Sequence, residues 1–166
     1  MRKFFLITVV ISLFLVSCMK DAGSNFTPQI ACSVIYRNGT DSMAVSDING
    51  KYVLDSMSVG DSISFQVVFD AIGNNLTLAQ VSSSDSAVLK LKYKNISSLD
   101  TAFSSADTLA GVFRFVEGYR MIGFTVEGKA RKAQTASVHF RVESDSEYSP
   151  AELDLLCPIK DTVKVN

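Results

Sequence analysis

The chain has 166 residues, of which 16 are lysine or arginine and 17 are aspartate or glutamate, so its net charge at pH 7 is −1. The lack of net positive charge argues against nucleic acid as a partner, because such binding needs a basic surface that displaces counterions. It argues equally against electrostatic adhesion to anionic lipid.

The first 17 residues have the layout of a secretory signal peptide. Arg2 and Lys3 precede an apolar run at 4–16, which is too short to span a bilayer comfortably. The sequence Leu-Val-Ser-Cys at 15–18 resembles the lipobox of bacterial lipoproteins. That resemblance implies cleavage before Cys18, acylation of its thiol and a mature chain anchored by lipid. The alternative is an ordinary signal peptide followed by a chance cysteine.

Residues 18–29 are predicted to form a flexible tether that carries the lipid on Cys18, because they are mostly small and polar. Met19 follows the cysteine, which by resemblance to lipoprotein sorting rules favours the outer membrane. Lys20-Asp21 weakly resembles the surface-export signal of Bacteroidota lipoproteins. The predicted location is therefore the outer membrane, with the choice between periplasm and cell surface left open.

Residues 30–166 are predicted to form a single domain of short strands. Apolar and polar residues alternate with a period of two, which is typical of strands with one buried face and one face in water. On the strand at 88–94, for example, three lysines alternate with Leu89, Leu91 and Tyr93. The predicted strands are 30–36, 51–54, 62–69, 75–81, 88–94, 112–116, 122–127, 138–143 and 155–165.

Turn residues separate these strands at short intervals. Asn49-Gly50 lies between 45–48 and 51–54 and predicts a tight hairpin. Two segments depart from the strand pattern: 97–110 favours a short helix or turn, and 149–152 is a possible helix start. In 97–110 the apolar residues recur at helical spacing, and at 149–152 a proline at the first helical position is followed by a glutamate.

The predicted fold is an all-β, antiparallel, immunoglobulin-like β-sandwich of about 7–9 strands with at most one or two short helices. In the middle of the chain, Val59-Gly60-Asp61 and the serine-rich run at 82–86 each precede a strand. This order resembles bacterial immunoglobulin-like domains. A small closed barrel is the alternative.

Two cysteines, Cys32 and Cys157, remain if Cys18 carries lipid. They lie near the two ends of the folded part, in a compartment where disulfides persist. A Cys32–Cys157 disulfide and two separate buried thiols are both compatible with the sequence. No metal site is expected, because the chain has one histidine and no Cys-x-x-Cys pair.

No catalytic residue and no cofactor are expected. His139 is the only histidine, and alternation places it on a polar strand face beside Arg141 and Glu143. No serine lies in a nucleophile elbow. The lysine stripe Lys90, Lys92 and Lys94 is interpreted as protection of a sheet edge, with an anionic ligand or a docking edge as the alternative.

Tyrosine is the residue type that would build a sugar-stacking platform in this chain, which lacks tryptophan. Alternation assigns Tyr93 to the core. The others flank turns, where tyrosine is compatible with binding; they are Tyr36, Tyr52, Tyr119 and Tyr148.

Asp followed by Ser or Thr and then an apolar residue occurs seven times, where composition predicts about one. The pattern resembles the O-glycosylation site of Bacteroidota secreted proteins, which implies glycans on the middle residue. Aspartate and serine also build turns that lead into strands, so both interpretations stay open. The candidate positions are Ser42, Ser56, Ser62, Ser86, Thr101, Thr108 and Thr162.

These observations predict a membrane-anchored, extracytoplasmic, non-enzymatic module that has an interaction or structural role with a protein or surface glycan as partner. The alternative is an accessory carbohydrate-binding lipoprotein. A hydrolase that combines His139 with distant serines and acids is less favoured.

Overall fold

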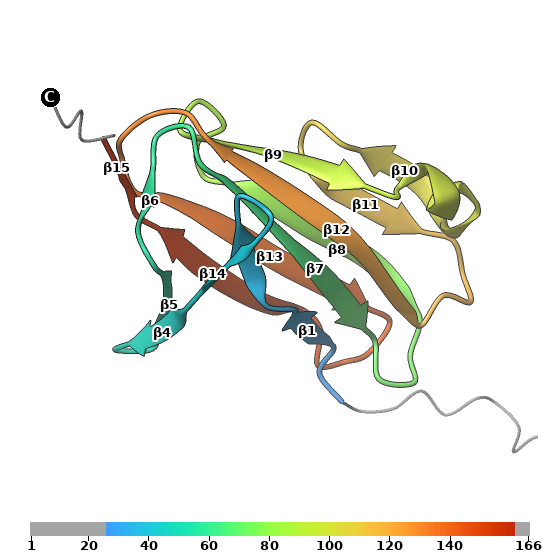
Figure 1. The fold of residues 1–166 in the computed structure, drawn as a ribbon. Helices are drawn as coiled ribbons and strands as arrows, with labels where there is room; N and C mark the ends of the chain where they lie inside the picture. The colour runs from blue at the N-terminus through green and yellow to red at the C-terminus, as the bar shows by residue number, and fades with distance from the viewer. Residues whose placement is uncertain (1–25, 162–166) are drawn as a thin grey trace, which may run out of the picture.

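The computed structural model describes residues 26–161 (Figure 1). The signal peptide, Cys18, most of the tether and Thr162 lie outside the described residues, so the predictions made for them stay predictions.

Two sheets face each other and a third, two-stranded sheet lies at one end of the sandwich (Figure 1). The first sheet has the order β3 (Asp41–Met43), β2 (Ile35–Arg37), β7 (Ser62–Asp70), β12 (Met121–Ala130), β9 (Leu89–Lys94), with β1 (Gln29–Cys32) also beside β7. The second has the order β10 (Phe103–Asp107), β11 (Val112–Phe115), β8 (Leu76–Ser83), β13 (Ala136–Ser144), β14 (Ala151–Cys157), β5 (Lys51–Leu54), β4 (Val45–Ile48). The small sheet pairs β15 (Ile159–Lys160) with β6 (Met57–Ser58), and η1 (Ser97–Ala102) is a short 3₁₀ helix.

The predicted fold class, an all-β immunoglobulin-like sandwich, is confirmed. The inward residues of both sheets form one apolar core, in which strict alternation buries one residue in two. Aromatic rings join the two layers: Phe65 of β7 meets Phe140 of β13 at 5.9 Å between ring centroids, and Phe113 of β11 meets Phe124 of β12 at 5.0 Å.

Several predicted strands divide into shorter ones, so the described residues contain more strands than expected. The segment 30–36 gives β1 and β2, and 155–165 gives the end of β14 and then β15, separated at Pro158. The hairpin at Asn49-Gly50 is confirmed, since β4 and β5 pair antiparallel around it. Two pairings, β14 with β5 and β15 with β6, are parallel, which alternation alone does not distinguish.

The short helix or turn predicted at 97–110 is confirmed only for its first part, as η1, and the helix start predicted at 149–152 is absent. At 97–110 the helical turn stops at Ala102, and β10 follows because Phe103 packs on Phe113 and Phe115 at 5.5 and 5.4 Å and pairs with β11. The helix at 149–152 is wrong, because β14 begins at Ala151 and pairs with β13 over seven residues. In both places strand pairing outweighs a local helical pattern.

Within 26–161, no helix is long and apolar enough to cross a membrane.

Candidate functional site

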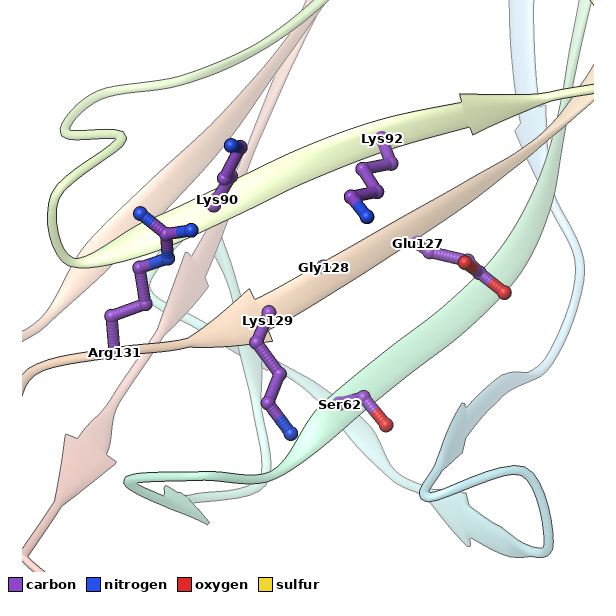
Figure 2. A pocket seen from close by; sticks show the side chains of 7 residues that line it. All are labelled: Ser62, Lys90, Lys92, Glu127, Gly128, Lys129 and Arg131. Atoms are coloured by element: carbon purple, nitrogen blue, oxygen red, sulfur yellow. The ribbon is translucent and has the colours of Figure 1, made fainter.

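Four basic side chains gather on the outer face of the β9–β12 strand pair (Figure 2). Lys90 and Lys92 lie on β9, Lys129 lies on β12, and Arg131 follows β12 directly. All four side chains are exposed, and we call them the basic face. They line a shallow hollow of about 270 Å³, whose other lining residues are Ser62, Glu127 and Gly128.

The strand register sets this arrangement. Lys129 stands directly opposite Lys90, and Glu127 stands opposite Lys92. The alternate residues of β9 turn inward, as the sequence predicts: Leu89 is buried, and Leu91 and Tyr93 are half-buried. The lysine stripe was therefore recognised from the sequence, whereas Lys129 and Arg131 join it only through the pairing of β12 with β9.

The acidic groups near the basic face are already engaged. Glu127 forms an ion pair with Lys94 at 2.5 Å. The ion pairs within 26–161 include none with Lys90, Lys92 or Arg131. The Nζ of Lys129 donates to the carbonyl oxygen of Gly60.

Asp61 is the other carboxylate that interacts with this region. Burial alone would raise its pKa, but the backbone N–H of Ser58, the side-chain amide of Asn38 and the charges of Arg37 and Lys129 lower it overall. Asp61 thus stays ionised and offsets part of the charge of Lys129. The uncompensated positive charge is concentrated on the other three side chains of the basic face.

A second, larger hollow of about 650 Å³ adjoins the first, because Lys90 and Arg131 line both. Its other walls are the serine-rich run at the end of β8 and in the loop after it, and the β10–β11 turn; they include Ser82, Ser83, Ser84, Asp85, Ser86, Thr108, Leu109 and Ala110. The carboxylate of Asp85 accepts the N–H of Ala87 at 2.8 Å. Hydroxyl groups and two basic side chains thus share one wall.

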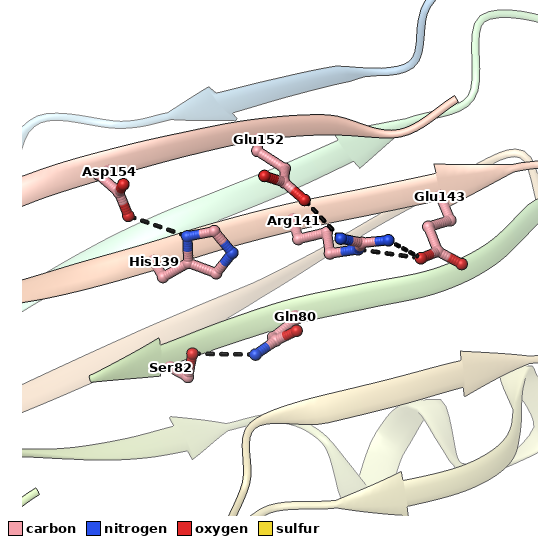
Figure 3. Close-up of polar contacts among 7 residues, drawn as sticks. All are labelled: Gln80, Ser82, His139, Arg141, Glu143, Glu152 and Asp154. Carbon is pink, nitrogen blue, oxygen red and sulfur yellow. Dashed lines mark hydrogen bonds and ion pairs between the residues drawn. The ribbon is translucent and has the colours of Figure 1, made fainter. Parts of the chain in front are cut away.

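His139 lies in a polar row across the outer face of the second sheet (Figure 3). Its Nδ1 is 2.9 Å from a carboxylate oxygen of Asp154 on β14. Ser82 on β8 stands opposite His139 on the other side, and its hydroxyl accepts from the amide of Gln80 at 3.1 Å. The register therefore brings an Asp, a His and a Ser side by side, which the sequence alone did not reveal.

Within 26–161, this row is not joined by the hydrogen bonds of a serine hydrolase triad. A nucleophilic serine needs a hydrogen bond to the imidazole and nearby donors for the oxyanion. Among the described residues, the Ser82 hydroxyl accepts from Gln80 and makes no hydrogen bond to His139, and the strands on both sides use their N–H groups in the ladder. The side chain of Asp154 is 65% exposed, so the row is solvated.

Arg141, next to this row, is held between two carboxylates. It contacts Glu143 and Glu152 at 2.5 Å each, and these hydrogen bonds and charges raise its pKa despite opposing desolvation. The group is thus already neutralised, which distinguishes it from the basic face.

The two cysteines are free thiols in the structure, Cys32 exposed on β1 and Cys157 buried on β14. The predicted Cys32–Cys157 disulfide is not formed in the structure. The alternative prediction, two separate buried thiols, is correct for Cys157 and wrong for Cys32. Burial raises the pKa of the Cys157 thiol to about 12, so it behaves as a small apolar residue. Cys32 borders an apolar groove of about 310 Å³. The groove lies between the strands β1, β2 and β3 on one side and the paired strands β5 and β14 on the other.

Some of the aspartates of the Asp-Ser/Thr-apolar motifs build turns, namely Asp61, Asp85 and Asp107. Asp107 accepts the N–H groups of Leu109 and Ala110, both at 2.9 Å. Three others, Asp55, Asp61 and Asp85, also accept backbone N–H groups. The bond to Asp55 comes from Ala44, eleven residues away, so the turn interpretation explains at least three of the seven motifs, without deciding whether the hydroxyls carry glycans.

The candidate hydroxyls differ in accessibility. Ser42, Ser86, Thr101 and Thr108 belong to exposed residues, whereas Ser56 and Ser62 are half-buried. The Ser62 hydroxyl is also bonded to Asn38 at 3.2 Å. The first four are therefore the sterically open sites among the described residues.

The tyrosines do not form an exposed row within 26–161. Tyr36 lies on β2 of the first sheet, Tyr52 on β5 of the second and Tyr148 in the loop before β14. Tyr93 faces the core, where it meets Phe113 and donates its hydroxyl to the carbonyl of Val81. In the same part of the chain, no group of three or more His, Cys, Asp or Glu side chains has a metal-binding arrangement.

No protein-family model matches the sequence, and no curated protein matches it. Among solved structures, the family 123 glycoside hydrolase from Clostridium perfringens aligns at 13% identity and a TM-score of 0.46, covering 84% of this chain and 28% of that one. A DUF4466 family protein from Parabacteroides merdae aligns at 15% identity and a TM-score of 0.40, covering 80% and 44%.

Domains 4 and 5 of the S-layer protein SbsC align at 12% identity and a TM-score of 0.36, covering 81% of this chain and 54% of that one. The chain thus spans about half or less of each of these three proteins. Similarity at this level does not transfer an activity, a ligand or a partner to this chain.

Proposed function

We propose that this chain is a lipid-anchored, non-enzymatic binding module of the bacterial cell envelope, held by Cys18 and using the basic face to engage its partner. The observation that supports this proposal most directly is the concentration of uncompensated positive charge at one hollow of a chain whose net charge is −1. A rigid sandwich that presents such a surface fits recognition, because the side chains are fixed by strand register.

The N-terminal lipobox resemblance supports the anchor. The described fold begins at Gln29 on β1, opposite Asp70 at one end of β7. Pro28 is buried and the Phe26 carbonyl accepts from the Ser146 hydroxyl, so residues 18–25 would join the lipid to that end of the sandwich. A tether of eight residues spans at most about 26 Å when extended, so the module would stay close to the membrane that carries it.

The anchor is tested by labelling growing cells with an alkyne analogue of palmitate and then isolating the chain. Incorporation into the wild type but not into the Cys18→Ala variant is the expected result. The anchor is contradicted if the wild type and the Cys18→Ala variant are labelled equally. It is also contradicted if neither is labelled although the cells have cleaved the signal peptide.

The binding role is tested by cross-linking intact native cells, capturing the chain and identifying the products by mass spectrometry. A reproducible envelope partner that is lost when the basic face is neutralised is expected. A partner that persists in that variant would place the binding surface elsewhere.

The hydrolase alternative rests on the Asp154–His139 pair with Ser82 beside it. If a His139→Ala variant keeps its fold but loses a measured hydrolytic turnover, the chain is a hydrolase and the proposal of a non-enzymatic module is refuted. An unchanged background rate in general esterase and glycosidase assays agrees with it.

A further inference from the structure

We propose that the ligand of the basic face is an acidic polysaccharide, whose carboxylate, sulfate or phosphate groups bind Lys90, Lys92 and Arg131. This inference rests on the binding role proposed above and names the class of ligand.

Edge protection explains only part of the basic face. Lysines on an edge strand discourage pairing with another sheet, and β9 is an edge of its sheet. Lys129, however, lies on β12, which is paired on both sides by β7 and β9. Arg131 lies beyond the last paired residue of that strand. A cluster that extends from the edge into the sheet therefore needs a second explanation, which an anionic ligand supplies.

The pairing of Lys90 with Lys129 is unfavourable without a ligand. Like charges directly opposite each other on one face of a sheet repel. Lys129 extends toward Gly60 instead of toward Lys90 (Figure 2), which leaves Lys90 and Arg131 together at the boundary of the two hollows. An anion at this boundary would contact both side chains.

The shape of the surface favours an extended ligand over a single small anion. The two hollows, about 270 and 650 Å³ in volume, adjoin because they share the lining side chains Lys90 and Arg131, and we call the pair the track. The smaller hollow is lined by cationic side chains, and the larger one adds the hydroxyls of the serine-rich run at 82–86. Alternating acidic groups and sugar hydroxyls match such a track, since hydroxyls both donate and accept hydrogen bonds.

The surroundings argue against a protein as the ligand. The core of a protein interface is apolar and depleted of charge. Next to the basic face, the outward positions of β7 and β12 are instead Ser62, Ser64, Thr125 and Glu127. The larger hollow has apolar lining from Leu91, Tyr93, Leu109 and Ala110. Only Leu109 among them is a large, exposed hydrophobic side chain.

The position of the basic face argues against the anchoring membrane as the ligand. The tether joins the fold opposite Asp70, whereas Ser62 and Lys129 lie opposite each other at the other end of β7. Eight residues of strand separate the two ends, which is about 27 Å at 3.4 Å per residue. A module anchored at one end presents the basic face at the far end.

The experiment measures binding of the full chain, purified in a nonionic detergent, to immobilised polygalacturonate, dextran sulfate and neutral dextran. Three forms are compared: the wild type, the basic-face variant Lys90→Gln/Lys92→Gln, and the control Lys51→Gln/Arg114→Gln. The control removes the same charge from exposed positions on the second sheet.

The wild type is expected to bind at least one acidic polymer and not neutral dextran. The basic-face variant should bind about tenfold more weakly, with a smaller dependence of affinity on salt because fewer counterions are released. The control variant should match the wild type. Equal loss in both variants would mean unspecific charge attraction and would overturn the inference.

Two further arms distinguish other sources of negative charge. Vesicles of an anionic phospholipid, or poly-glutamate as an acidic peptide, would overturn the inference if they bound as tightly as the polysaccharide. Failure of all polysaccharides, with a cross-linked protein partner still captured from cells, would refute the ligand class and leave the binding role intact. Failure of both would refute the binding role as well.

The inference also constrains the predicted O-glycosylation. Ser86 and Thr108 both line the larger hollow, so glycans on these residues would fill part of the proposed track. A chain made in cells without the glycosylation machinery should therefore bind at least as well as the native form. Weaker binding by the unglycosylated form contradicts a track through this hollow.

Discussion

Replacing Gly111 by alanine is expected to destabilise the sandwich more than the same change at Gly118 or Gly128. Gly111 has a φ of +69°, and a Cβ built on it would lie 1.9 Å from the carbonyl oxygen of Val81 and 2.2 Å from the hydroxyl of Tyr93. The Val81 N–H also donates to the Gly111 carbonyl at 2.9 Å. The new methyl group would thus separate β8 from the β10–β11 turn and break the Tyr93–Val81 hydrogen bond.

The expected cost can be assembled from these contacts. A non-glycine residue in the left-handed region costs about 1–2 kcal/mol. Leaving a buried carbonyl without its hydrogen bond costs about 1–3 kcal/mol. The sum is about 2–5 kcal/mol, which for a chain of this size lowers the melting temperature by about 10 °C. Urea unfolding followed by far-ultraviolet circular dichroism measures the free energy of unfolding directly.

Gly118→Ala is the matched control. Gly118 has a φ of +100° but no atom within 4 Å of its Cβ position, so it carries the backbone cost without the clash. We expect it to lose only about 1–2 kcal/mol. If Gly111→Ala is no more destabilising than Gly118→Ala, the close approach of Gly111 to Val81 and Tyr93 is not present in the protein.

Three further outcomes are expected. Gly128→Ala should lower the free energy of unfolding by about 1–3 kcal/mol. This is less than for Gly111→Ala, because the new Cβ would lie 2.8 Å from the side chain of Ile63, which can move, and not from backbone. Urea unfolding curves of the two variants measure the difference. The pKa of Asp61 is lowered in the fold, so its stabilisation is present above about pH 4 and is lost as the pH falls below that value; Asp61→Asn should therefore flatten the acid limb of a plot of stability against pH. Asp107→Ala should lose about 1 kcal/mol because two N–H groups lose their acceptor, whereas Thr108→Ala should leave stability unchanged; equal effects would contradict the turn-building role of the aspartate.

The fold was predictable from alternation because each long strand has one face in the core. In β7, β12 and β13 the buried positions alternate strictly with less buried ones, and that period is a local property of the sequence. The tight turn at Asn49-Gly50 was predictable for the same reason, since both residues adopt the positive φ that such a turn requires.

The errors occurred where partners distant in sequence decide the local structure. The helical spacing at 97–110 continues past Ala102, but Phe103 is drawn into a strand by its contacts with Phe113 and Phe115. Pairing with β13 similarly makes 151–157 a strand. A period in the sequence states which residues share a face but not which element lies opposite that face.

The candidate site shows the same division. The stripe of Lys90 and Lys92 could be recognised on one strand, but its continuation to Lys129 and Arg131 depends on β9 pairing with β12. The Asp154–His139–Ser82 row depends on β13 lying between β8 and β14. In both cases the chemistry is set by register, which no single strand encodes.

Register also makes the basic face testable through stability, because Lys90 faces a basic residue and Lys92 faces an acidic one. Lys90 stands opposite Lys129, whereas Lys92 stands opposite Glu127. Such cross-strand pairs are worth about 0.2–1 kcal/mol, unfavourable for like charges and favourable for opposite charges. Lys90→Thr is therefore expected to raise the free energy of unfolding by a few tenths of a kcal/mol, and Lys92→Thr is expected not to.

Both substitutions place a residue that favours strands at an exposed edge position, so the difference between them isolates the electrostatic contribution. Urea unfolding at low ionic strength measures it, and added salt should reduce the difference because both sites are exposed. A stabilised Lys90→Thr variant that no longer binds the acidic polymer would show that the wild type keeps an unfavourable charge pair for the sake of its ligand. If Lys90→Thr is not more stable than Lys92→Thr, repulsion at Lys90 does not exist, and the basic face has no need of an anion.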